Sequence, residues 1–162
     1  MFLDPEEFAF TRTLEAAYSD IKSELLALEA SAFQPWPEKF LYGSGWDVFG
    51  LQAFGKRIEA NCRQCPATDR ALREVPGMTT AGFSRLRPRT RIVPHVGYTD
   101  DVLRCHLGLV TPQRCGLQVG REQRAWTEGR CLVFDDTVLH SAWNQGGRDR
   151  VVLLIDFERP AS

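Results

Sequence analysis

Apolar residues in the first part of the chain recur at helical spacing. Leu14, Ala17, Ile21, Leu25 and Leu28 follow one another at steps of three or four positions, which places them on one face of a helix. Glutamate and lysine fill much of the rest of this stretch. The pattern predicts one amphipathic helix over residues 5 to about 31, with its apolar face against the core. A stretch with proline and glycine between residues 34 and 45 then breaks the period.

The pattern changes after this interruption. Residues 46–55 predict a strand that ends at a turn, and residues 67–75 predict a short helix that Pro76-Gly77 closes. From Thr79 onward, short apolar segments are separated by turn residues. The segments that predict strands are residues 81–86, 92–95, 105–110, 117–119, 131–134, 140–143 and 151–157.

Short strands at this spacing, with no helices between them, favour a sandwich or a barrel. We therefore predict a mainly β fold, an antiparallel jelly roll preceded by an α-helical segment. We expect one domain over residues 1–162, with the helical part at about 5–45 and the jelly-roll core at about 46–160.

Composition and charge exclude several classes of protein. The chain has 162 residues, of which 43% are hydrophobic and 25% charged, as in an ordinary globular protein. A net charge of −1 gives no electrostatic reason to bind nucleic acid or an anionic membrane. The acidic start, residues 1–7, does not resemble a leader peptide, and no apolar run approaches the ~20 residues of a membrane span. We expect a cytoplasmic protein; its oligomeric state stays open.

The five cysteines do not predict a disulfide framework. Cys62-Arg63-Gln64-Cys65 is a single CxxC motif, and a zinc site of this type needs a second pair that the sequence lacks. Reduced thiols are the favoured interpretation.

All three histidines, His95, His106 and His140, fall within residues 95–140. His95 and His140 lie at the ends of predicted strands, and two imidazoles that meet at the mouth of a barrel can hold a first-row divalent metal. Arg104 shares a strand face with His106, and Arg150 follows one hairpin after His140. Arginine is suited to bind a carboxylate. Taken singly, however, each of these residues fits a structural role equally well, as a hydrogen-bonded histidine or a surface ion pair.

Taken together, these residues form ordered motifs that resemble the aspartyl/asparaginyl β-hydroxylase family. The motifs are Pro94-His95-x-Gly97-x-Thr99, Arg104-x-His106-Leu107-Gly108-Leu109, Trp126-x-Glu128-Gly129, Phe134-Asp135-Asp136-x-x-x-His140-x-x-Trp143-Asn144 and Arg150. The resemblance runs from about residue 46 to 160. It implies a double-stranded β-helix, which is a cupin-like jelly roll, and a dioxygenase that uses Fe(II), 2-oxoglutarate and O2.

The resemblance also implies roles by position. His95 and His140 match the two iron ligands, while Gly97 stands where related oxygenases carry a third, acidic ligand. Arg150 and Ser84 match the residues that bind the distal carboxylate of 2-oxoglutarate, and His106 matches a further contact to this cosubstrate.

The remaining matched positions lie around this centre. We expect Arg104 to bind a carboxylate of the substrate, and Asp135 and Asp136 to orient ligands or close the turn before His140. Trp126 is expected to be a structural edge residue.

The substrate is the least determined part of the interpretation. We favour hydroxylation of an unactivated C–H bond, at the β-carbon of an Asp- or Asn-like amino acid, free or in a small peptide. A lipid acyl chain and a cupin-like metal-binding or sensor domain without catalysis are the alternatives. Arg85, Arg87, Arg89 and Arg91 alternate along one predicted strand, where they could bind an acidic substrate or form a solvated face.

Overall fold

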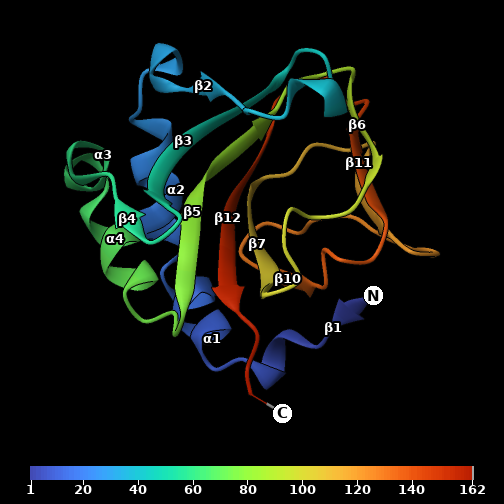
Figure 1. Ribbon diagram of the computed structural model, residues 1–162. Coiled ribbons are helices and arrows are strands. Elements are labelled where there is room, and N and C mark those ends of the chain that lie inside the picture. Colours follow the sequence, from blue (N-terminus) through green and yellow to red (C-terminus); the bar gives the residue numbers. More distant parts are fainter. Residues whose placement is uncertain (162) are drawn as a thin grey trace.

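Two antiparallel β-sheets face each other in the computed structural model, which describes residues 1–161 (Figure 1). The larger sheet has the order β1-β10-β7-β12-β5-β3-β2, with β4 paired to β3, and the smaller sheet has the order β6-β11-β8-β9. This arrangement confirms the predicted mainly β jelly roll.

The strands of the larger sheet are β1 (Phe2–Leu3), β2 (Gln34–Pro35), β3 (Trp46–Ala53), β4 (Lys56–Arg57), β5 (Met78–Leu86), β7 (Val102–Val110), β10 (Cys131–Phe134) and β12 (Arg150–Glu158). Those of the smaller sheet are β6 (Thr90–His95), β8 (Cys115–Val119), β9 (Glu122–Arg124) and β11 (His140–Asn144). Every segment that predicted a strand is confirmed as one. The short strands β1, β2, β4 and β9 were not predicted separately, because two or three residues carry no readable alternation.

Helices cover the outer face of the larger sheet (Figure 1). They are α1 (Phe10–Ala16), α2 (Tyr18–Leu26), α3 (Glu59–Gln64) and α4 (Pro66–Leu72), with short 3-10 turns η1 (Pro5–Glu7), η2 (Ala30–Ala32) and η3 (Lys39–Leu41). None of the helices within residues 1–161 is long and apolar enough to cross a membrane.

The prediction of one continuous helix over residues 5 to 31 was wrong. The helical path breaks at Ala17, where ψ is 0° and the N–H is shared between the carbonyls of Thr13 and Leu14. Just after this break, the Tyr18 hydroxyl donates a hydrogen bond to Glu128, 3.0 Å away. The apolar face is nevertheless buried as expected, since Leu14 and Ile21 are both fully inaccessible.

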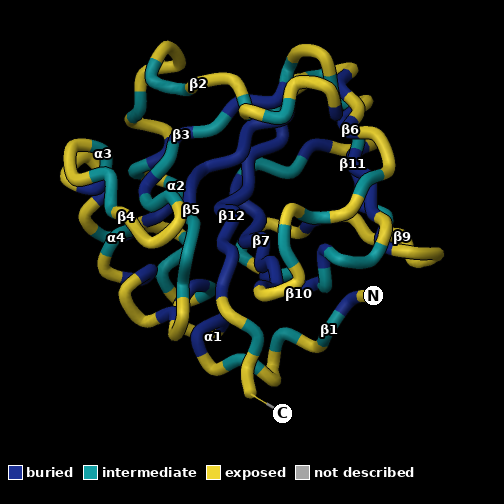
Figure 2. The backbone as a smooth tube through the Cα atoms, viewed as in Figure 1, coloured by how far each residue is buried: buried dark blue, intermediate teal, exposed yellow. Residues whose placement is uncertain are grey.

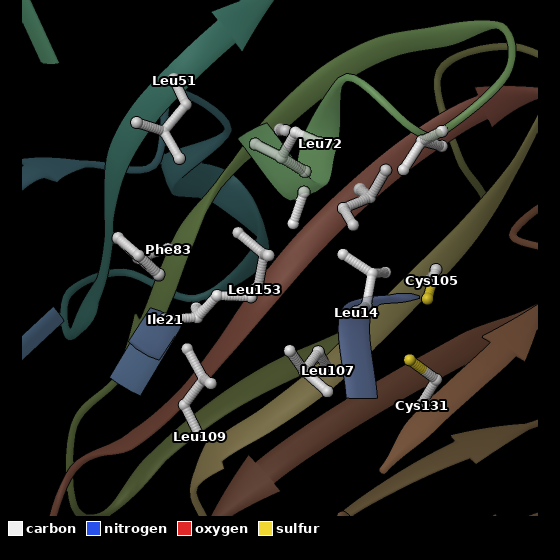
Figure 3. Close-up of a cluster of buried hydrophobic side chains, with 14 of the residues drawn as sticks. Leu14, Ile21, Leu51, Leu72, Phe83, Cys105, Leu107, Leu109, Cys131 and Leu153 are labelled. Carbon is white, nitrogen blue, oxygen red and sulfur yellow. The ribbon is translucent and has the colours of Figure 1, made fainter. Parts of the chain in front are cut away.

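The central strands of the larger sheet are buried on both faces (Figure 2). On β7, Leu107 and its alternate neighbours pack against the helices, while Arg104 and His106 point between the two sheets. On β12, Leu153 packs against the helices in the same way (Figure 3). A second apolar cluster, around Phe134 and Leu117, fills the space between the sheets. The polar side chains of β7 thus lie on the side of the larger sheet that faces the smaller sheet, next to this apolar cluster.

The prediction that four arginines share one strand was also wrong. Arg85 lies on β5 and Arg91 on β6, and the turn between them reverses the chain with Arg89 at a φ of 62°. Arg85 and Arg87 both bind the Asp47 carboxylate, each with an N–O distance of 3.0 Å. These two guanidinium groups are therefore not free for an acidic substrate.

All five cysteines are buried free thiols. Burial raises the pKa of the Cys65 thiol to about 12. A thiol with such a pKa is a weak nucleophile, so we treat Cys62 and Cys65 as packing residues.

The helix-covered face of the larger sheet should carry much of the stability. We expect Leu107→Ala, which removes a fully buried side chain, to lower the free energy of unfolding by about 2–5 kcal/mol. Leu26→Ala is the matched control, because Leu26 is 66% exposed on α2 and its truncation should cost about 0.5 kcal/mol. Urea denaturation measures both, and equal losses would contradict the assigned core.

Candidate functional site

His95 and His140 lie directly opposite each other on neighbouring strands. The antiparallel register of β6 and β11 pairs the two residues, and their ring centroids are 4.3 Å apart. Cross-strand partners on one face of a sheet are held close by the backbone itself. Residues far apart in the sequence thus meet in the space between the sheets.

Both imidazole rings present the same nitrogen to this space. His95 Nδ1 lies 2.7 Å from the Val93 carbonyl oxygen, and His140 Nδ1 lies 2.9 Å from that of Val138. A carbonyl accepts a hydrogen bond only from Nδ1–H, so Nε2 of each neutral ring keeps its lone pair. Burial lowers the pKa of His140 to about 4, which keeps the ring neutral. Two Nε2 atoms side by side, each directed away from the backbone carbonyl that its Nδ1 binds, are suited to bind a divalent metal.

Gly97 stands two residues after His95 and has no space for a side chain. A Cβ placed on Gly97 would overlap the carboxylate of Asp136, and the Gly97 N–H donates to the Asp136 carbonyl oxygen at 2.7 Å. Among residues 1–161, no group of three or more His, Cys, Asp or Glu side chains is arranged to hold a metal. The donor set is therefore two imidazoles, with the Asp136 carboxylate close by.

Asp136 is itself fully buried, and neither of its carboxylate oxygens has a hydrogen-bond partner among the described residues. Burial raises the pKa of Asp136 to about 6, and the nearest positive charge, Arg104 Nη2, is 4.0 Å from Oδ2. Asp136 does not line the pocket of the histidines; its carboxylate lies against Gly97, next to Arg104.

His106 is a buried hydrogen-bond donor aimed into the same space. Trp126 Nε1 donates to His106 Nδ1 at 3.0 Å, which places the proton of the neutral ring on Nε2. Burial, together with the charges of Arg150 and Arg104, holds the pKa of His106 well below its ordinary value. His106 Nε2 has no acceptor among the described residues. Its N–H is therefore available to an oxygen atom of a ligand.

Arg150 is buried without a carboxylate partner among the described residues. Its side chain is 1% exposed, and its Nη2 donates to the Ser84 hydroxyl and carbonyl oxygens, at 3.0 and 3.2 Å. The guanidinium lies over the Trp126 ring, 4.5 Å from the centroid, and Nε has no acceptor. Burial lowers the pKa of Arg150 to about 10. This positive charge has no counter-charge among the described residues, so an anion beside it would offset the cost of its burial.

Arg104, in contrast, is already paired. Its Nε and Nη2 donate to the two oxygens of Asp156, at 2.7 and 3.0 Å. Burial alone would lower the pKa of Arg104, but the charge and hydrogen bonds of Asp156 raise it. The Tyr98 hydroxyl also donates to Asp156, at 3.1 Å. The Arg104 guanidinium is thereby held in one orientation, and its hydrogen bonds to Asp156 use only Nε and one N–H of Nη2.

Most of these side chains line one narrow pocket, with a cavity volume of about 20 Å³. The structure brings together most of the predicted site residues in its lining: Ser84, His95, Arg104, His106, His140 and Arg150. Most of the buried polar atoms without a partner belong to this region, namely those of His106, Asp136 and Arg150. A diacid beside a two-histidine metal would satisfy the donors, so the residues present fit the expected groups.

Asp135 lies outside this pocket. Its carboxylate binds the N–H and hydroxyl of Thr137, at 3.0 and 2.7 Å, and Arg159 Nη2 at 2.5 Å. Although burial alone would raise the pKa of Asp135, these hydrogen bonds lower it to about 2. Of the two roles expected for Asp135, the geometry corresponds to closure of the turn before β11.

Sequence reasoning missed how three residues hold the site in shape. Trp126, expected at an edge, is buried between His106 and Arg150. Trp46 Nε1 donates to the Ser84 hydroxyl at 2.8 Å, and Asp156 fixes Arg104. Their partners lie 20 to 52 positions away in the chain, and only the Trp126-x-Glu128-Gly129 motif hinted at one of them.

The sequence profile described as "Aspartyl/Asparaginyl beta-hydroxylase" matches residues 15–160. An ornithine lipid ester-linked acyl 2-hydroxylase of Rhizobium tropici is 34% identical over 97% of this chain and 60% of its own length. The human aspartate beta-hydroxylase domain-containing protein 2 is 41% identical over 78% of this chain and 37% of its own. The human aspartyl/asparaginyl beta-hydroxylase is 32% identical over 96% of this chain and 22% of its own length. The chain thus spans 22% to 60% of the length of these relatives.

Solved structures share the fold at low sequence identity. A prolyl hydroxylase of Trichoplax adhaerens matches with a TM-score of 0.63 at 11% identity, over 88% of this chain and 78% of that one. A prolyl-4-hydroxylase of Pseudomonas putida matches with a TM-score of 0.52 at 14% identity, over 93% and 88%. These matches support the jelly-roll assignment.

The three histidines should separate into two functions. We expect His95→Ala and His140→Ala to lose binding of Fe(II), or of Co(II) as a stable substitute, by about tenfold to a hundredfold or more, because each removes an Nε2 donor. His106→Ala should keep its metal affinity, since its Nε2 carries a proton. Anaerobic titration followed by absorption measures the affinities; equal losses in all three variants would contradict this assignment.

Proposed function

The chain belongs to the aspartyl/asparaginyl β-hydroxylase family, and from this premise we propose that it is an Fe(II)- and 2-oxoglutarate-dependent dioxygenase. Its partner is a small amino-acid-like or peptide substrate, which it hydroxylates at an unactivated C–H bond. When bound, the iron, the 2-oxoglutarate and O2 supply the oxidising chemistry, and 2-oxoglutarate is converted to succinate and CO2.

The observation that carries this proposal is the buried and unpaired charge of Arg150. Burial of an arginine without a carboxylate costs several kcal/mol, and a ligand carboxylate would offset this cost. The Ser84 hydroxyl accepts from both Arg150 and Trp46, so its own proton is free to point to the same ligand. A domain that only bound a metal would have no use for this arrangement, which argues against the non-catalytic alternative.

The protein's own contribution is to hold the iron and to orient the cosubstrate and the substrate beside it. His95 and His140 would hold the iron through Nε2, while Arg150 and Ser84 bind the distal carboxylate of the cosubstrate. His106 Nε2–H donates to an oxygen of the cosubstrate nearer the histidines. Asp136 fills the space beside Gly97 and holds the turn after His95 in place through the Gly97 N–H bond to its carbonyl oxygen.

Arg104 supports an amino-acid-like substrate. It lines the pocket beside the histidines, and Asp156 fixes its orientation, so the remaining N–H groups can bind a carboxylate or carbonyl oxygen of the substrate. The aromatic ring of Trp36 lies 5.9 Å from the Arg104 guanidinium and stacks on Trp46. We propose that an Asp- or Asn-like residue is bound here with its β-carbon toward the histidines.

One further observation favours an acyl chain as the second candidate substrate. Val93, Val96 and Leu139, which flank the two histidines in the sequence, are between 43% and 55% exposed. Exposed aliphatic residues that neighbour the two histidines in the chain are suited to contact an apolar chain. The Rhizobium relative named as a lipid acyl hydroxylase is similar over nearly the whole of this chain.

Replacement of Arg150 by methionine tests the cosubstrate site without relying on turnover. We expect Arg150→Met to unfold at the same or a higher temperature than the wild type, because a buried unpaired charge is removed. With Fe(II) under anaerobic conditions, 2-oxoglutarate at a hundredfold excess over its Kd should stabilise the wild type by about 2.7 kcal/mol. The same concentration of 2-oxoglutarate should not change the stability of Arg150→Met.

The control for this prediction is Arg148→Met, which alters an exposed arginine in the adjoining turn and should retain the full ligand shift. The weak visible absorption band that forms when 2-oxoglutarate chelates Fe(II) gives an independent measurement. A ligand shift in Arg150→Met equal to that of the wild type would contradict the assigned carboxylate site.

The substrate class is tested by the residues around the two histidines. Val96→Ser with Leu139→Ser should raise the KM for an acyl lipid about tenfold, since two methyl-rich contacts are lost. The same variant should leave the KM for an Asp- or Asn-containing peptide unchanged. Succinate release from both substrate classes is the measurement; stimulation by the lipid alone would reject the amino-acid substrate.

A further inference from the structure

A second hollow lies on the outer face of the smaller sheet, away from the histidine pocket. Its volume is about 620 Å³, it is open to solvent, and its lining includes Arg89, Arg91, Arg114, Trp143 and Gly147. On β6, Ile92 packs between the sheets and Arg91 points outward; on β11, Ala142 is inside and Trp143 is half-buried outside. We call this hollow the arginine groove.

The three guanidinium groups of the arginine groove have no counter-charge. None of Arg89, Arg91 and Arg114 forms an ion pair or a side-chain hydrogen bond with any described residue. No carboxylate lines the groove. In a chain with a net charge of −1, three positive charges around one hollow create a local positive potential.

Backbone hydrogen bonds hold together the turns that contain Arg89, Arg114 and Gln145, and this brings the charges to one place. The Arg89 N–H donates to the Asn144 carbonyl oxygen at 2.6 Å, and the Gln145 N–H donates to the Arg114 carbonyl oxygen at 2.9 Å. Arg89 and Arg114 have φ values of 62° and 65°, in the left-handed region that glycine or asparagine adopts at less cost. Arginine at both positions therefore adds backbone strain that glycine would avoid in the same turns.

The floor of the groove is an aromatic ring. Trp143 pairs with Arg91 on β6 and with Gly116 on β8. A Cβ on Gly116 would lie 2.6 Å from the Trp143 ring, so the glycine leaves room for the indole to lie on the sheet. A flat ring with arginines around it offers stacking next to charge.

We infer that the arginine groove binds a phosphate group, carried by a soluble molecule or by the headgroup of a lipid. Arginine binds phosphate oxygens through two parallel N–H bonds, and three guanidiniums can surround one or two phosphates. The ring of Trp143 would stack on a planar group attached to that phosphate. This site is separate from the histidine pocket and does not depend on the function proposed for it.

The test replaces the two strained arginines by the residue that their backbone prefers. Arg89→Gly with Arg114→Gly removes two charges and keeps the turns, so the midpoint of thermal unfolding should change by no more than about 4 °C. Calorimetric titration with tripolyphosphate at low salt should show binding to the wild type and an affinity at least about tenfold lower in the double variant. Binding of Fe(II) in the histidine pocket should be unchanged.

Two control variants sharpen this experiment. Arg121→Gln removes an exposed arginine of the β8–β9 turn, outside the groove, and should bind tripolyphosphate as the wild type does. Trp143→Phe should weaken the binding of ADP more than that of tripolyphosphate, because only ADP carries a base to stack. Equal weakening in Arg121→Gln would mean a general effect of charge and would overturn the proposal.

Vesicles distinguish the two sources of the phosphate. Binding to phosphatidylcholine vesicles that contain phosphatidylglycerol, absent with phosphatidylcholine alone and lost in the double variant, would assign a lipid headgroup. Binding of ADP or tripolyphosphate without vesicle binding would assign a soluble molecule. If the wild type binds none of these probes, or the double variant binds them as tightly, the groove is not a phosphate site.

Discussion

The register of β12 between β5 and β7 is the constraint on which the site depends. These strands are buried on both faces, so each residue must suit either the helix side or the side between the sheets. Leu153 pairs with Leu107 and with Phe83, and these residues pack against the helices. A slip of one residue would turn every side chain to the opposite face. The leucine core therefore sets the positions of Arg150, His106 and Ser84, although it touches no ligand.

The same arrangement explains how the site tolerates groups that a core would normally reject. Arg150, His106 and Asp136 are buried with unused hydrogen-bonding atoms, which lowers the stability of the ligand-free protein. Trp126 offsets part of this cost, since it donates to His106 and lies against the Arg150 guanidinium. The side chains of His106 and Arg150 are thus oriented before a ligand binds. The stability lost by burying their unpaired atoms would be recovered when a ligand pairs with them.

Local patterns in the sequence were sufficient for the longer strands, and they singled out three histidines that the fold brings into one pocket, because period-2 alternation and residue type are readable along the chain. They were insufficient where a distant contact decides the structure. The helix over residues 5 to 31 breaks at Ala17, where Tyr18 turns to reach Glu128. Gly97 was correctly seen to offer no ligand, but the reason, the Asp136 carboxylate in its place, exists only in three dimensions. The four arginines are likewise separated by a turn between β5 and β6, and Asp47 binds two of them from another strand.

The two buried arginines of the pocket differ in a way that bears on what each can select. Arg150 has no carboxylate among the described residues, so a negative charge on its ligand is favoured outright. Arg104 is neutralised by Asp156, and Asp136 lies 4.0 Å from it, so the cluster carries no excess positive charge. With Nε and one Nη2 proton bound to Asp156, the N–H groups that remain can select the geometry of an oxygen pair more than its charge. A peptide carbonyl or an ester oxygen satisfies them as well as a carboxylate does. Under the proposed function, the preference for a negative charge would therefore come from Arg150, and Arg104 would select the substrate by shape and hydrogen bonds.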